Sequence, residues 1–110
     1  MQRDPASFLW DARQAADAVI AFTRGRTRED LPEDLLLRSA VERQLEIVGE
    51  ALSQLSRLDP VLARRIPDVS RIIGLRNILV HGYAQVDAER VWRIVQENLP
   101  ELRATLDRLL

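Results

Sequence analysis

The 110-residue sequence contains no cysteine, no lysine and a single histidine, His81. Without cysteine the chain cannot form disulfides or thiolate metal sites, and one histidine argues against a zinc site built from protein ligands alone. No apolar run approaches the roughly 18 residues of a membrane span. The first residues, MQRDPASFLWDARQ, also lack the apolar segment of a secretory signal. We therefore expect a cytoplasmic protein with no metal, no cofactor and no membrane association.

The charge balance is close to neutral, with 16 basic and 17 acidic residues and a net charge of -1. A protein that binds duplex DNA takes much of its affinity from an excess of basic side chains. We therefore expect no DNA binding, and any contact with nucleic acid to be local. Arginine suits phosphate contacts, but its use at every basic position also fits a coding bias and marks no particular site.

Helical periodicity runs through almost the whole chain. The content of 46% apolar and 30% charged residues is that of an ordinary soluble domain, so we expect residues 1–110 to form one domain. Asp4 can cap a first helix that Pro5 begins and Gly25 ends. Its predicted apolar stripe is Phe8, Ala12, Ala15, Val19 and Phe22.

A second helix is expected from about Leu31 or Pro32 to about Leu58. It carries two apolar stripes, one of Val41, Leu45, Val48, Leu52 and Leu55 and another of Ala40, Ile47, Ala51 and Leu58. Two stripes are typical of a central helix or of one shared with a second subunit.

Three further segments complete the expected architecture. A short turn lies between Pro60 and Pro67, and a third helix spans residues 69–81. Asp87 can cap a fourth helix, which is expected to kink at Pro100. The predicted fold is all-α, an antiparallel bundle of four to five helices.

The third helix contains the stretch GLRNILVHGY, residues 74–83, in which polar groups are concentrated. Arg76 has apolar neighbours on its helix, so its guanidinium must reach solvent, pair with a carboxylate such as Glu46 or Glu50, or face a cleft. Asn77 and His81 are four residues apart and share one helix face. Gly82 is suited to end the helix, which would place Tyr83 just beyond it.

These residue types together fit the cleavage of RNA without a metal. Histidine can take or give a proton near pH 7, and arginine can stabilise charge on phosphate oxygens. Two proton-transfer groups are needed, whereas each chain has one histidine. A twofold symmetric homodimer would bring two copies of Arg76 and His81 into one cleft.

RNILVHGY matches the R-x4-H-x-Y signature of the HEPN superfamily as found in HepT-like ribonuclease toxins. The segments AVERQLEIVGEALSQLS and VDAERVWRIVQENLPEL also resemble the second and last helices of that family. The resemblance covers essentially the whole chain. It implies a dimeric HEPN bundle in which Arg76 and His81 are catalytic and Asn77, which follows the arginine in many members, supports them.

The same resemblance implies a role and a partner. HepT-like ribonucleases are toxins of type VII-like toxin-antitoxin pairs, and the cognate antitoxin is a minimal nucleotidyltransferase, MNT. That partner transfers AMP to the tyrosine of the motif, here Tyr83, and so silences the toxin. An alternative remains open, in which the chain is a non-catalytic helical subunit that helps a nucleotidyltransferase bind its substrate.

Overall fold

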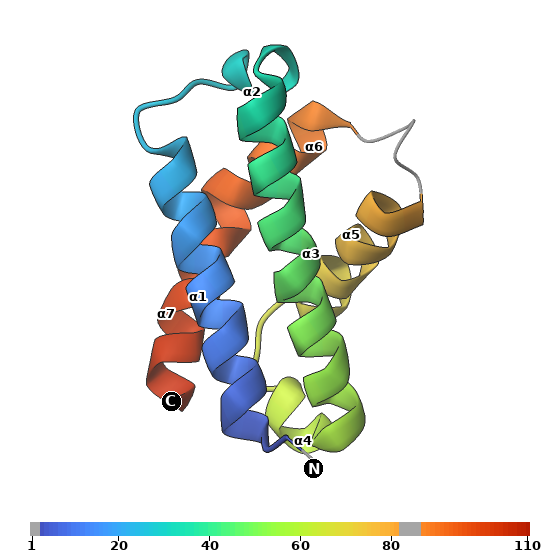
Figure 1. Cartoon of the computed structure of the whole chain (residues 1–110). Helices are drawn as coiled ribbons and strands as arrows, with labels where there is room; N and C mark the ends of the chain where they lie inside the picture. The colour runs from blue at the N-terminus through green and yellow to red at the C-terminus, as the bar shows by residue number, and fades with distance from the viewer. Residues whose placement is uncertain (1–2, 82–86) are drawn as a thin grey trace.

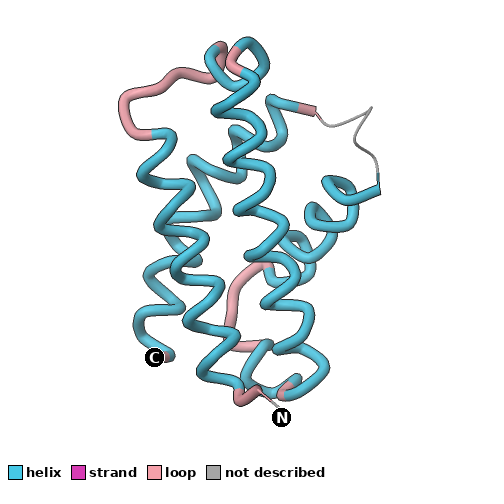
Figure 2. The backbone as a smooth tube through the Cα atoms, viewed as in Figure 1, coloured by secondary structure: helices cyan, strands magenta, loops and turns pink. Residues whose placement is uncertain are grey.

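Helices make up most of the computed structural model (Figure 1). The structure describes residues 3–81 and 87–110; for residue 81 it describes only the backbone. The helices are α1 (Pro5–Thr23), α2 (Asp30–Glu33), α3 (Leu35–Leu58), α4 (Pro60–Ala63), α5 (Val69–His81), α6 (Ala88–Arg93) and α7 (Leu99–Leu109). A π-helical turn, Ile94–Asn98, joins α6 to α7. Residues 3–81 and 87–110 contain no strand, which confirms the all-α prediction (Figure 2).

Helix α3 is the central element of the bundle. It packs antiparallel to α1 along one side and against α5 along another, while α7 lies beside α1 (Figure 1). Most of the largest fully buried side chains come from α3 and the last helices, among them Leu45, Leu52, Leu99 and Leu106, and α1 contributes Val19. Nowhere in the described ranges is a helix both long and hydrophobic enough to cross a bilayer.

The first helix begins as its sequence predicts. The Asp4 carboxylate accepts a hydrogen bond from the Ser7 backbone N–H at 2.9 Å, and this bond lowers the pKa of Asp4. Pro5 occupies the first turn, and Gly25 follows the helix with φ = 75°. Ala12, Ala15 and Val19 of the predicted stripe are buried, but Phe22 at its end is 40% exposed.

The predicted second helix is wrong at its start, because Asp34 divides it into α2 and α3. Asp34 has extended backbone angles, φ = -101° and ψ = 100°, and its side chain accepts a hydrogen bond from the Leu37 backbone N–H at 3.1 Å. Aspartate competes with the helical backbone for hydrogen bonds in this way, and so favours a new N-cap over continuation of the preceding turn.

The two apolar stripes of α3 have different surroundings. Every residue of the first stripe is buried, which confirms it as the core face. In the second stripe Ala51 is buried, Ile47 is half-buried and Leu58 is 42% exposed. The second stripe therefore lies only partly under the rest of the chain.

The last helical segment also follows the prediction in outline. Asp87 accepts a hydrogen bond from the Glu89 backbone N–H at 3.0 Å and caps α6. The irregularity expected at Pro100 takes the form of the π-helical turn just before it. Proline has no N–H to donate, and its ring crowds the carbonyl group four residues earlier, at Gln96, so the helix widens there.

The N-cap at Asp34 can be tested by replacing it with alanine. Asp34→Ala should lower the free energy of unfolding by about 1 kcal/mol, because the N-terminal N–H groups of α3 lose their acceptor. Asp34→Asn keeps an acceptor and should remain within a few tenths of a kcal/mol of wild type. Urea denaturation followed by circular dichroism measures both, and equal stability of Asp34→Ala and wild type would contradict the cap.

Candidate active site

The site is organised around a close approach of α3 and α5 at Gly49. A Cβ atom placed on Gly49 would overlap the Cβ of Arg76 and lie 2.8 Å from its Cγ. Only a glycine on α3 leaves room for the stem of Arg76 between the two helices. The backbone of Arg76 is therefore fixed against the central helix.

The Arg76 guanidinium is held at its far end by two oxygen acceptors. Nη2 lies 2.9 Å from Oε2 of Glu50 on α3, and Nη1 donates to Oδ1 of the adjacent Asn77 at 3.0 Å. The Arg76 side chain is 27% exposed, so its charged end is partly open to solvent. The Nε atom is fully buried and has no hydrogen-bond partner among the described residues. The guanidinium is thus pre-positioned and still accessible from one side.

Glu50 links this arginine to a further polar group. Its second oxygen, Oε1, accepts a hydrogen bond from Gln54 Nε2 at 2.9 Å, one turn further along α3. The bonds form a continuous chain from Gln54 through Glu50 and Arg76 to Asn77. Of the two carboxylates predicted as partners of Arg76, Glu50 is therefore the one in contact.

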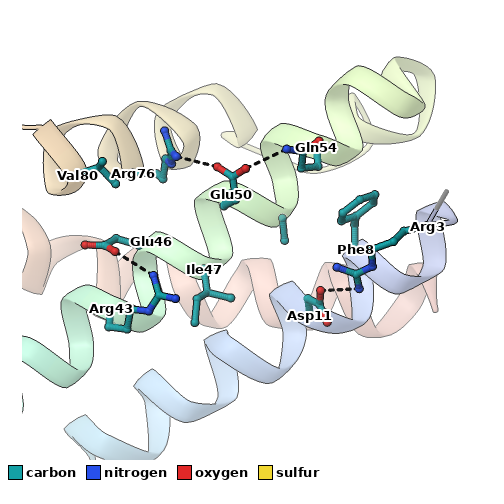
Figure 3. A pocket seen from close by; sticks show the side chains of 11 residues that line it. Arg3, Phe8, Asp11, Arg43, Glu46, Ile47, Glu50, Gln54, Arg76 and Val80 are labelled. Atoms are coloured by element: carbon teal, nitrogen blue, oxygen red, sulfur yellow. Dashed lines mark hydrogen bonds and ion pairs between the residues drawn. The ribbon is translucent and has the colours of Figure 1, made fainter. Parts of the chain in front are cut away.

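An open cavity of about 520 Å³ lies on this side of the bundle, between the start of α1, the outer face of α3 and α5 (Figure 3). Its apolar floor includes Ile47 and Ala51 of the second stripe on α3. Its charged side chains form three pairs: Arg3–Asp11 at 2.6 Å, Arg43–Glu46 at 3.3 Å and Arg76–Glu50 at 2.9 Å. Phe8, Gln54 and Val80 complete the lining, and we refer to this cavity as the ion-paired pocket.

The predicted site residues differ in how far the structure describes them. Arg76 and Asn77 lie together on α5, and the pocket reaches Val80, one residue before the end of that helix. His81 is the last residue of α5, and its side chain is not described. Gly82 and Tyr83 lie outside the described residues. The roles predicted for His81 and Tyr83 stay predictions.

Sequence reasoning missed two components of this site. Gly49 lies inside a helix, where glycine costs about 1 kcal/mol relative to alanine, and that cost was a signal of close packing. Arg3, Phe8 and Asp11 also line the pocket, although they are far from the motif in sequence. Nothing in their local pattern indicates that the start of α1 reaches the face of α3 that carries Glu50.

Comparison with known proteins identifies the family of the chain. The model of the family described as ribonuclease HepT-like matches residues 12–109, nearly the entire chain. The chain belongs to this family. Its all-α bundle is accordingly a HEPN fold, and Arg76 lies within the matched region.

Individual relatives of the HepT-like family match over nearly their full lengths. "Putative RNase MJ1380" of Methanocaldococcus jannaschii is 33% identical over 108 residues, covering 96% of each chain. "Probable ribonuclease HepT" of Thermococcus cleftensis is 33% identical over 113 residues, covering 99% of this chain and 98% of the relative. No solved structure gives a significant match.

The close approach at Gly49 predicts opposite effects for two glycine substitutions. Gly49→Ala should lower the free energy of unfolding by about 1–3 kcal/mol, because the added methyl group forces α3 and α5 apart at Arg76. Gly74→Ala on α5 is the matched control, because a Cβ added there meets no atom within 4 Å. Since alanine favours a helix more than glycine does, this change should leave the free energy of unfolding unchanged or raise it by up to about 1 kcal/mol. Thermal and urea unfolding measure both, and a tolerated Gly49→Ala would refute the packing argument.

Proposed function

We propose that this HepT-like protein is a metal-independent endoribonuclease and the toxin of a toxin-antitoxin pair. The observation that carries the proposal is the Arg76 guanidinium, held between Glu50 and Asn77 on the wall of an open pocket, in a chain that belongs to a ribonuclease family. A guanidinium fixed in this way can bind a phosphate group with little loss of side-chain freedom. The substrate class that follows is RNA.

In the proposed reaction, one His81 imidazole removes the proton of a ribose 2′-hydroxyl. The 2′-oxygen attacks the adjacent phosphorus, and the bond from phosphorus to the 5′-oxygen of the next nucleotide breaks. A second His81, in its protonated form, donates a proton to that departing 5′-oxygen. Arg76 stabilises the negative charge that develops on the non-bridging phosphate oxygens, and Asn77 keeps the guanidinium oriented.

This chemistry requires two chains, because each supplies one histidine. We therefore propose a homodimer in which two copies of α5 border a shared cleft. The exposed Val80 supports such an assembly, since it leaves apolar surface one residue before His81, near the end of α5.

The antitoxin in this proposal is a cognate MNT nucleotidyltransferase that transfers AMP to Tyr83. Tyr83 lies seven positions after Arg76 in the sequence and two after His81. An attached AMP phosphate would carry negative charge close to these residues. It would compete with RNA for Arg76 and block the cleft by its bulk.

Substitutions of the two proposed catalytic residues provide the main test. Purified protein is incubated with RNA in the presence of a chelator, and Arg76→Ala and His81→Ala should each slow cleavage by about 10²- to 10⁴-fold. Arg71→Ala, which removes an exposed arginine from the same helix, is the matched control and should cleave like wild type. If Arg76→Ala and His81→Ala both cleave RNA as fast as wild type, these residues are not the catalytic site.

Modification of Tyr83 is tested separately by mass spectrometry. After incubation with the nucleotidyltransferase and ATP, a tryptic peptide that contains Tyr83 should gain the mass of one or more AMP groups, and cleavage should fall accordingly. Tyr83→Phe should gain no mass and should keep its ribonuclease activity in the presence of the partner. An unmodified wild-type tyrosine would refute silencing by this route.

A further inference from the structure

We propose that the ion-paired pocket binds a nucleobase of the RNA substrate, with Arg3 and Phe8 as its stacking platform. This inference rests on the proposed ribonuclease function, because it assigns part of that substrate to a second set of residues. The scissile phosphate remains at Arg76, and the base belongs to a nearby nucleotide of the same strand.

The platform consists of a flat cation on an aromatic ring. The Arg3 guanidinium carbon lies 4.7 Å from the centroid of the Phe8 ring. Asp11 holds the same guanidinium at 2.6 Å, and the Ser7 backbone carbonyl accepts a further hydrogen bond from it at 3.3 Å. The Arg3 side chain is nevertheless 50% exposed. Guanidinium planes and aromatic rings are the groups on which proteins stack unpaired RNA bases.

The charges of the pocket favour an uncharged group over a second phosphate. Away from Arg76, each arginine of the pocket is matched by a carboxylate: Asp11 for Arg3 and Glu46 for Arg43. A second phosphate placed at either of these arginines would also meet its carboxylate. A base instead presents an uncharged ring to the apolar floor and edge groups to polar side chains.

Size and polar groups agree with this occupant. The volume of about 520 Å³ falls within the range of roughly 300–1,000 Å³ that is usual for pockets that bind small organic groups. Gln54 offers an amide oxygen and nitrogen, of which the nitrogen already donates to Glu50. A base that bonds to the amide oxygen would be connected through Glu50 to the Arg76 guanidinium.

The test measures binding without cleavage. A fluorescent RNA hexamer with a 2′-O-methyl group on every ribose has no nucleophile, and its dissociation constant is measured by anisotropy. Arg3→Lys keeps the charge but removes the flat stacking surface, and Phe8→Leu keeps an apolar group without the ring. Each should raise the dissociation constant by about fivefold or more. Phe22→Leu, on the same helix but outside the pocket, should bind like wild type.

A series of hexamers, each lacking one base, locates the stacked nucleotide. In wild type the loss of one particular base should weaken binding, and in Arg3→Lys the same loss should have no further effect. If Arg3→Lys and Phe8→Leu bind the hexamer as tightly as wild type, while wild type cleaves unmodified RNA, the base site is refuted and the ribonuclease proposal stands. If wild type does not cleave unmodified RNA, while both variants bind the hexamer more weakly, only the ribonuclease reaction is refuted.

Two other results would also overturn the base site. If Phe22→Leu loses as much affinity for the hexamer as Phe8→Leu does, the loss reflects a general disturbance of α1 and not a contact in the pocket. A change in oligomeric state in Phe8→Leu, measured by sedimentation, would identify a second copy of the chain as the occupant of the pocket.

Discussion

The packing of Arg76 against Gly49 is the contact on which the candidate site depends. It brings the stem of a charged side chain into the crossing of two helices, where apolar packing is usual and an unpaired charge is costly. The cost is limited because Glu50 follows Gly49 directly and reaches the guanidinium, while the end of the side chain remains partly solvated. Two consecutive residues of α3 thus have separate tasks: Gly49 provides space and Glu50 provides the counter-charge.

Much of the fold could be predicted because the relevant signals are local. Caps at Asp4 and Asp87, the stop at Gly25 and the core stripe of α3 each depend on a few neighbouring residues, and the structure confirms them. The break at Asp34 was missed because the apolar pattern on either side of it continues without interruption. An aspartate can lie inside a helix or cap a new one, and the choice depends on the packing of the preceding turn.

The candidate site was predictable only in part, for a related reason. The motif placed Arg76 and Asn77 on one short helix, but the spacing alone allowed Glu46 as well as Glu50 to be the partner. Those carboxylates are one turn apart on α3, so the choice is set by the axial position at which the helices cross. That position depends on Gly49, whose significance appears only when the second helix is present.

The balanced charges of the ion-paired pocket also determine how it responds to salt. An isolated arginine gains affinity for nucleic acid when it displaces cations condensed on the phosphates, and that gain is lost as the salt concentration rises. Arg3 and Arg43 are each already neutralised by a carboxylate of the same chain, so they add little to such an exchange. Stacking of a base on Arg3 and Phe8, as proposed, would therefore depend on shape rather than on ionic strength. It would keep its strength in a concentrated electrolyte in which a basic surface releases its ligand.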